Sequence, residues 1–264
     1  MAKLWGFGDS FTAGVGIHNK HDNGLFPYGN TYQDTIYLTQ LGKELNLKVE
    51  NCANGGNSNG GILHNIIENL KFIGKDDTVI IGCSVESRIP IPMPNNTRIN
   101  LQYGLANRIN EFLAGRKTKP KGDTLFSIFT KSELKTIHDY FYTIFPKLST
   151  PYYDKYIGLF TDIQDLLIKN GTTCLIWDAT CWDEFENIEN WTKVSEMGQV
   201  LDRHWSPNGN MLFKEVLLQA LNKNTLFVNS KLLSQTQWIE KAKEKHEYIP
   251  ALMTFHNKKV ASLI

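Results

Sequence analysis

Long hydrophobic runs are lacking in this sequence of 264 residues, and the longest, such as residues 78–82 and 175–177, are only as long as a buried strand. A membrane-spanning helix needs about 20 consecutive apolar residues. No secretory leader is recognisable either, because residues 3–7 already have the pattern of a first strand. We therefore expect no membrane span and a chain that is cytoplasmic when it is made, with release by lysis and association with a virion as open alternatives.

An excess of one charge is lacking as well. The chain has 28 basic and 27 acidic side chains, which gives a formal net charge of +1. Proteins that bind nucleic acid or an anionic membrane usually carry a clear basic excess on one face. Neither kind of partner is therefore expected.

Cysteines with metal-binding spacing are also missing. The chain has four cysteines, and they show neither C-x-x-C nor C-x-H spacing. Three of them fall at or near expected core strands, where a free thiol behaves as a small apolar side chain. We expect reduced structural thiols, no metal site and no organic cofactor.

The sequence is rich in apolar residues, at 41%, and alternates strand patterns with helix patterns. Such alternation predicts the α/β class, with a central parallel sheet covered by helices on both faces. Ligands bind to such folds outside the carboxyl ends of the strands. Strands are expected at residues 3–8, 47–52, 77–82 and 172–177, and helices at 31–46, 62–73, 153–170 and 208–221.

One segment, at about residues 88–150, breaks the alternation. It opens with prolines at 90, 92 and 94, which force an extended start, and continues with helical patterns at 101–113 and 131–145. We expect one domain over residues 1–222 with this helical insertion, and a C-terminal extension at 223–264 that packs on the same domain. The insertion either shapes the substrate site as a lid or merely covers an edge of the sheet.

The first candidate for chemistry is Ser10, which follows the first strand directly in Gly8-Asp9-Ser10. A serine placed there projects its hydroxyl from the top of the sheet. If a helical turn follows, the backbone N–H of Ser10 can donate to a developing oxyanion. A serine that only caps a helix would show the same local pattern.

The second candidate lies near the end of the alternating region, in Asp202-Arg203-His204. A serine hydroxyl is a weak nucleophile until a base takes its proton, and histidine suits this task near neutral pH. A carboxylate beside the imidazole fixes its tautomer and stabilises its charged form. We expect both residues in a loop just before a helix that starts at Ser206-Pro207, with a merely solvated acidic-basic loop as the alternative.

Together these two blocks resemble the SGNH (GDSL) hydrolase family. Gly8-Asp9-Ser10 with Gly14 is similar to the family's first block, and the late Asp-x-His segment before a glycine-containing helix start is similar to its last. The resemblance covers residues 3–82 and 172–221. It implies a flavodoxin-like three-layer α/β/α sandwich and a serine esterase that cleaves carboxylic esters, often acetyl esters of carbohydrates, through a Ser10-His204-Asp202 triad and an acyl-enzyme.

The middle blocks of the family are less well matched. The resemblance implies that Gly56 donates its backbone N–H to the oxyanion together with Ser10. Ser84 stands where the family has an asparagine that supplies a further donor, and its hydroxyl is shorter. Asn57 and Asn59 are alternatives for that donor. The last block also departs, because Asp202 and His204 are two residues apart where three is usual.

Other polar and aromatic residues near these blocks have both a functional and a structural interpretation. Arg88 meets an anionic substrate, pairs with Glu86 or is solvated. Trp205 either lines the pocket or packs against the helix start. Asp178, which ends the fourth expected strand, is a reserve for orienting the base. The candidate substrate contacts are Asn57, Asn59, Arg88 and Trp205.

The function expected from the sequence is therefore that of a serine esterase acting on a small-molecule or carbohydrate ester. One alternative is a catalytically weakened binding module or virion-associated structural module of the same fold. A second alternative is an O-acyltransferase, which would use the same residues and pass the acyl group to a sugar hydroxyl.

Overall fold

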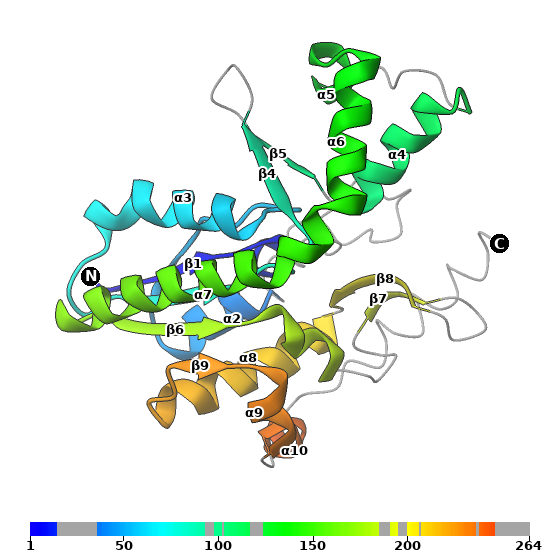
Figure 1. Cartoon of the computed structure of the whole chain (residues 1–264). Coiled ribbons are helices and arrows are strands. Elements are labelled where there is room, and N and C mark those ends of the chain that lie inside the picture. Colours follow the sequence, from blue (N-terminus) through cyan, green and yellow to red (C-terminus); the bar gives the residue numbers. More distant parts are fainter. Residues whose placement is uncertain are drawn as a thin grey trace.

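The computed structural model describes residues 1–14, 36–92, 98–101, 103–116, 124–184, 191–194, 200–205, 207–235 and 238–245. A five-stranded sheet lies at its centre, between two layers of helices (Figure 1). All neighbouring strands in it are parallel, which confirms the predicted α/β/α sandwich. The strands, in their order across the sheet, are β2 (Lys48–Asn51), β1 (Lys3–Phe7), β3 (Thr78–Gly82), β6 (Thr173–Trp177) and β9 (Phe227–Val228).

The strands bury side chains on both faces, as parallel sheets do. Because side chains alternate along a strand, Leu4 and Ile80 point to one helix layer while Trp5 and Val79 point to the other. The first layer is formed by α2 (Tyr37–Glu44) and α8 (Pro207–Asn222). The second layer is formed by α3 (Asn59–Asn69), which continues as the short 3₁₀ helix η2 (Leu70–Phe72), and by α7 (Phe145–Lys169).

Two element boundaries differ from the sequence prediction. Helix α3 begins at Asn59 because Ser58 caps it: the Ser58 Oγ accepts a hydrogen bond from the Gly61 N–H at 3.3 Å. Gly60 and Gly61 therefore fall in the first turn of the helix. Helix α7 begins at Phe145, well before residue 153, with a proline in its first turn where the missing N–H costs nothing. The expected helix start at residues 31–35 lies outside the described residues.

The insertion forms a small unit with a core of its own. Its hairpin pairs β4 (Ile89–Pro92) with β5 (Arg98–Leu101), and Figure 1 shows the following helices projecting beyond the α3 and α7 layer. A capping box between Thr130 and Glu133 starts the longest of these helices. They are α4 (Tyr103–Leu113), α5 (Thr124–Ile128) and α6 (Lys131–Thr143).

The segment before α8 corrects the prediction of a loop. β7 (Trp191–Val194) and β8 (Val200–Trp205) form an antiparallel hairpin, so Asp202 and His204 lie on a strand. Aromatic and β-branched residues favour such pairing, and Trp191 stands opposite Trp205. The short 3₁₀ helix η3 (Ala179–Glu184) precedes the hairpin.

The segment after α8 contributes to the main domain. It supplies β9, which completes the sheet by pairing with β6, and two helices, α9 (Ser230–Gln235) and α10 (Trp238–Lys245). Helix α10 packs on α8, and α9 packs on η3. Trp238 and Ala242 of α10 are buried in the same core as the α2 and α8 layer.

Candidate active site

Ser10 is the first residue of α1 (Ser10–Ala13), a single helical turn that follows β1 at the carboxyl edge of the sheet. Asp9 caps this turn, because its Oδ1 accepts a hydrogen bond from the N–H of Phe11 at 3.0 Å. Gly14 ends the turn with a left-handed φ of 72°. A strand followed at once by a capped turn therefore fixes the backbone of Ser10, as the sequence predicted.

The glycine before this turn is required by close packing. A Cβ atom at Gly8 would lie 2.2 Å from Oγ1 of Thr12, which is far inside van der Waals contact. The Thr12 Oγ1 atom is itself held, because it accepts a hydrogen bond from the Tyr37 hydroxyl at 2.9 Å. Burial raises the pKa of Tyr37, so this hydroxyl keeps its proton and remains a donor.

The side chain of Ser10 is buried, and its Oγ has no hydrogen-bond partner among the residues that the structure describes. A buried hydroxyl without a partner is uncommon, because it gives up its hydrogen bonds to water. A catalytic role is one of the explanations for such a group in a native protein. The serine that the sequence selects is thus distinguished from an ordinary capping serine, since the cap here is Asp9.

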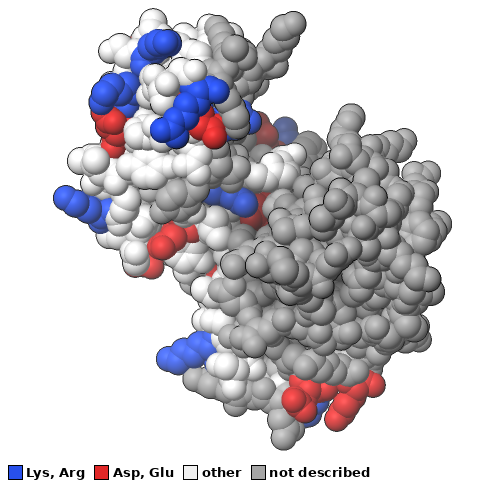
Figure 2. Space-filling view, turned by 90° about the vertical axis from the view of Figure 1, so that its right-hand side faces the viewer, with Lys and Arg blue, Asp and Glu red and all other residues white. Residues whose placement is uncertain are grey.

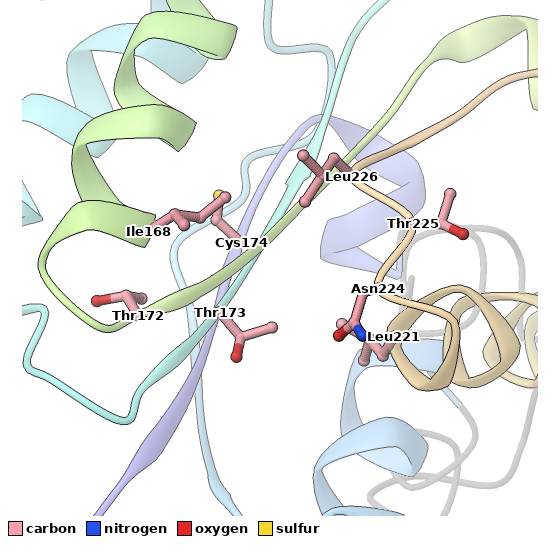
Figure 3. Close-up of a pocket in the computed structure, with 8 residues that line it drawn as sticks. All are labelled: Ile168, Thr172, Thr173, Cys174, Leu221, Asn224, Thr225 and Leu226. Carbon is pink, nitrogen blue, oxygen red and sulfur yellow. The ribbon is translucent and has the colours of Figure 1, made fainter.

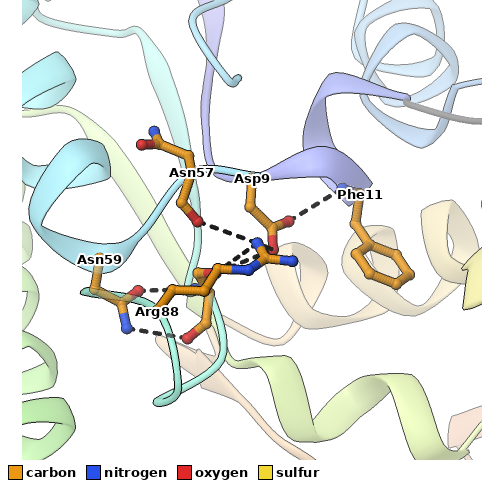
Figure 4. Close-up of polar contacts among 6 residues, drawn as sticks. Asp9, Phe11, Asn57, Asn59 and Arg88 are labelled. Atoms are coloured by element: carbon orange, nitrogen blue, oxygen red, sulfur yellow. Dashed lines mark hydrogen bonds and ion pairs between the residues drawn. The ribbon is translucent and has the colours of Figure 1, made fainter. Parts of the chain in front are cut away.

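A buried polar network surrounds the start of α1 (Figure 4). The Nη1 atom of Arg88 lies 2.7 Å from Asp9 Oδ2, 2.8 Å from Ser84 Oγ and 3.1 Å from the carbonyl oxygen of Asn57. The hydroxyl of Ser84 in turn donates to Asp9 Oδ2 at 3.2 Å. One guanidinium nitrogen therefore joins the segments that follow β1, β2 and β3.

The charges in this network are well shielded from water. The side chain of Asp9 is 0% exposed and that of Arg88 is 12% exposed. Removing one partner of such a buried pair leaves the other charge uncompensated. The sequence-based alternative that pairs Arg88 with Glu86 is not what the structure has: Glu86 Oε2 accepts a hydrogen bond from the Thr150 hydroxyl at 3.2 Å instead.

Two of the predicted substrate contacts have structural partners. Both side-chain amide atoms of Asn59 bind the backbone of Ser84, with its Oδ1 accepting from the N–H at 2.7 Å and its Nδ2 donating to the carbonyl at 3.0 Å. Trp205 is 2% exposed and packs in the core, with its ring centroid 4.4 Å from that of Phe213. Its position agrees with the packing alternative given by the sequence.

Asn57 is placed differently. Its carbonyl oxygen accepts from Arg88, while its side-chain Nδ2 is buried without a hydrogen-bond partner among the described residues. Gly56, beside it, has a left-handed φ of 72°, and a Cβ there would meet no atom within 4 Å. The glycine is therefore needed for its backbone conformation, at a position next to the network.

The strand that carries Asp202 and His204 lies beside α1. The ring of Trp205, the residue after His204, meets the ring of Phe11, the residue after Ser10, edge to face at 4.8 Å between centroids. Asn210 holds the end of this strand, donating from Nδ2 to the carbonyl oxygen of Trp205 at 3.2 Å. The structure thus brings the first and last blocks of the motif together.

The side chains of Asp202 and His204 lie outside the described part of the chain, so their contact with Ser10 stays a prediction. Asp178, the reserve for orienting the base, lies at the carboxyl end of β6. Its Oδ1 accepts hydrogen bonds from the N–H and the hydroxyl of Thr180, and burial raises its pKa. These hydrogen bonds stabilise the turn between Asp178 and Thr180.

Sequence reasoning missed the ion pair between Asp9 and Arg88. A usable signal was present, because a carboxylate placed directly after a buried strand needs a cation or several N–H donors. The sequence could not say which cation, since Asp9 and Arg88 are far apart along the chain and meet only when β1 and β3 pair.

A separate cavity of about 250 Å³ lies at the opposite edge of the sheet (Figure 3). Thr172, Thr173 and Cys174, at the amino end of β6, line one side of it, and Leu221, Thr225 and Leu226 line the other. This cavity is not part of the candidate site, because the start of α1 lies at the carboxyl edge of the sheet and the cavity lies at the amino edge.

The charges on one face of the molecule are mixed. In Figure 2, which views the molecule from the right-hand side of Figure 1, basic and acidic side chains are interspersed on the coloured part.

In the described ranges no group of three or more metal-binding side chains comes together. None of the helices in those ranges has the length and apolar character required to cross a bilayer.

Comparisons with known proteins give one distant likeness. No family model matches the chain, and a search of curated proteins found no match. Among solved structures the chain is similar to that of a member of the lipolytic protein G-D-S-L family from Veillonella parvula, with 14% sequence identity and a TM-score of 0.33, over 84% of this chain and 97% of that one. A likeness of this size adds no weight to the argument, and the fold assignment rests on the sheet order.

Proposed function

We propose that this protein is a serine hydrolase that cleaves carboxylic esters, with Ser10 as nucleophile, His204 as base and Asp202 as the group that orients the base. The observation that carries the proposal is the buried Oγ of Ser10, which has no hydrogen-bond partner among the described residues, at the start of a capped turn on the carboxyl edge of the sheet. The contact between Phe11 and Trp205 supports it further, because it brings the strand of His204 to the same turn.

The proposed reaction has two steps. Ser10 Oγ attacks the ester carbonyl carbon while His204 takes the hydroxyl proton, and the tetrahedral intermediate then expels the alcohol, which His204 protonates. Water attacks the acyl-enzyme in the second step, with His204 again accepting a proton. The bond between the acyl carbon and Ser10 Oγ then breaks, His204 returns the proton to Oγ, and the carboxylic acid leaves. Neither step needs a redox change.

The negative charge of the intermediate is held by N–H donors in this proposal. The N–H of Ser10 stands at the first position of α1, where no carbonyl of the same turn can accept from it. Gly56 supplies the second N–H. Ser84 is a weaker candidate, because its single hydroxyl hydrogen points to Asp9 and would have to turn away to reach the substrate.

The substrates proposed are small-molecule or carbohydrate esters, with acetyl esters of carbohydrates as the first to try. The same residues would serve an O-acyltransferase, in which a sugar hydroxyl replaces water in the second step. Product analysis with and without an acceptor sugar separates these two reactions.

A fluorophosphonate probe tests whether the site is reactive, since it forms a covalent bond only with an activated serine. We expect one phosphonyl group on the protein, located on Ser10 by peptide mapping, and no label on Ser10→Ala. His204→Gln should slow the labelling strongly, because the serine then lacks its base. An unlabelled but folded wild-type protein would instead favour a binding module that has the fold and no catalysis.

A further inference from the structure

We propose that Arg88 is a catalytic residue whose guanidinium group donates a hydrogen bond to the oxyanion formed on attack by Ser10. This inference rests on the proposed function. It adds a third donor to the N–H groups of Ser10 and Gly56, and it assigns to Arg88 the task that the sequence resemblance gives to the residue at position 84.

The position of the guanidinium is fixed on one side. Its Nη1 atom contacts Asp9 Oδ2, Ser84 Oγ and the Asn57 carbonyl oxygen, which come from the ends of three neighbouring strands. The dashed lines of Figure 4 that reach Arg88 meet at this one nitrogen. A long side chain held in this way loses little further freedom when it binds a ligand, which favours a precise role.

The other side of the guanidinium is available. Arginine carries five N–H bonds in a rigid fork, and Nη1 accounts for two of them. No described residue accepts a hydrogen bond from Nη2 or Nε, while the side chain remains 12% exposed. These N–H groups are therefore available to a ligand at the carboxyl edge of the sheet, where both Arg88 and Ser10 lie.

The hydroxyl of Ser84 cannot easily do the same task. Arginine only donates, so Ser84 Oγ accepts from Arg88 and gives its one hydrogen to Asp9. The side chain of Ser84 ends at Oγ, one bond beyond Cβ, and Nη1 of Arg88 lies 2.8 Å from this atom. Arg88 thus fills the space that the amide group of a longer residue at position 84 would occupy.

Charge also favours this role. Asp9 is buried only one residue from the nucleophile, and its negative charge alone would oppose the formation of an oxyanion nearby. The guanidinium of Arg88, 2.7 Å from Asp9 Oδ2, offsets that charge. A charged donor in a site shielded from water stabilises a developing negative charge more strongly than a neutral one does.

Arg88→Lys is the first test variant, because lysine keeps a positive charge for Asp9 but has no second nitrogen to offer the substrate. We expect kcat for a small acetyl ester to fall by roughly 10²–10³-fold with KM little changed, as when one oxyanion donor is lost. Arg116→Ala, which removes an exposed arginine at the end of α4, is the matched control and should keep full activity.

Ser84→Asn/Arg88→Ala provides the decisive rescue. An asparagine amide has two N–H bonds, so it can donate one to Asp9 and the other to the oxyanion in the space left by Arg88. We expect this double variant to recover at least tenfold of the activity lost in Arg88→Ala. Thermal unfolding of each variant separates a loss of donor from a loss of fold.

Three results would overturn the inference. Activity of Arg88→Lys within a few-fold of wild type would show that the free N–H groups do not act. A folded double variant no more active than Arg88→Ala would show that Arg88 serves only to hold Asp9. Wild-type hydrolysis that survives Ser10→Ala would remove the proposed function itself, which distinguishes the two failures.

Discussion

Asp77 shows how one residue can hold two strands of this sheet. It precedes β3, is 5% exposed, and accepts hydrogen bonds from the Lys3 N–H at 2.7 Å, the Trp5 Nε1–H at 2.8 Å and the Gly74 N–H at 2.9 Å. Burial alone would raise its pKa, but these bonds outweigh burial and the pKa of Asp77 is lowered. The charged form is therefore the one that stabilises the fold.

Asp77→Asn is expected to lower the free energy of unfolding by about 2 kcal/mol near pH 7, because the remaining amide oxygen is uncharged. A carboxyl whose pKa is lowered on folding stabilises above its unfolded value of about 4, and this contribution is lost as the pH falls through the lowered value. Urea unfolding at a series of pH values measures this. The difference between wild type and variant should shrink below about pH 4, and a pH-independent difference would contradict the assignment.

Single residues at the candidate site were predictable from the sequence to different degrees. Ser10 could be selected because its position after a buried strand depends only on local pattern. The partner of Asp9 could not, because Arg88 reaches it through the pairing of β1 with β3. The burial of Trp205 in the core likewise depends on distant aromatic residues such as Tyr37 and Trp177.

At the scale of elements, β8 and α1 are joined by an aromatic contact. Trp205 of β8 packs on Phe11 of α1 and on Phe213 of α8. It therefore couples the position of the strand that bears His204 to the turn that bears Ser10. A change in this contact should alter catalysis as well as stability.

Trp205→Ala is expected to destabilise the fold by roughly 3–5 kcal/mol, as loss of a buried tryptophan side chain does, and to lower kcat for ester hydrolysis in protein that is still folded. Trp238→Ala is the matched control, because Trp238 is 3% exposed in the same core but lies on α10. The control should lose comparable stability and retain kcat. Equal kcat in the two folded variants would mean that the aromatic contact does not position the base.

Strand positions could be predicted well, because a continuous buried apolar run such as Thr78–Gly82 leaves few alternatives. The hairpin of β7 and β8 was missed because its polar residues gave no clear alternation. β9 was missed because two residues carry no period, and only its pairing with β6 makes it a strand. Helix α7 begins earlier than expected and contains Pro151 within it, so a proline does not end the helix here.

The whole molecule has more than one hydrophobic core. One core lies on each face of the sheet. A third core, which includes Leu101, Ile109 and Phe141, lies inside the insertion. The insertion follows directly from Arg88, so the residue proposed to contact substrate stands at the junction of the two units. A unit with a separate core is expected to open separately.

Hydrogen exchange tests this division. Backbone amides of α4 and α6 are expected to exchange at least tenfold faster than those of β1, β3 and β6 under native conditions, since the insertion can open without breaking the sheet. Exchange resolved by peptide mass spectrometry provides the comparison, with α7 as the helix shared by both units. Equal protection of the insertion and the sheet would show a single cooperative unit.

The overall architecture could be predicted because strand and helix patterns alternate over most of the chain, and that alternation has few solutions. The insertion could be located, since residues 88–150 break the pattern, but its shape depends on contacts such as that of Phe112 with Phe126 that no local pattern encodes. At the site, the contact of Asp9 with Arg88 could not be anticipated, because it joins residues that are distant along the chain.

The central claim is that Ser10 is the nucleophile of an ester hydrolase. The most direct measurement is the rate of hydrolysis of a small acetyl ester by wild type and by Ser10→Ala, with folding of both checked by thermal unfolding. We expect hydrolysis by wild type and a loss of roughly 10⁴-fold or more in the variant. Hydrolysis at the wild-type rate by folded Ser10→Ala would contradict it.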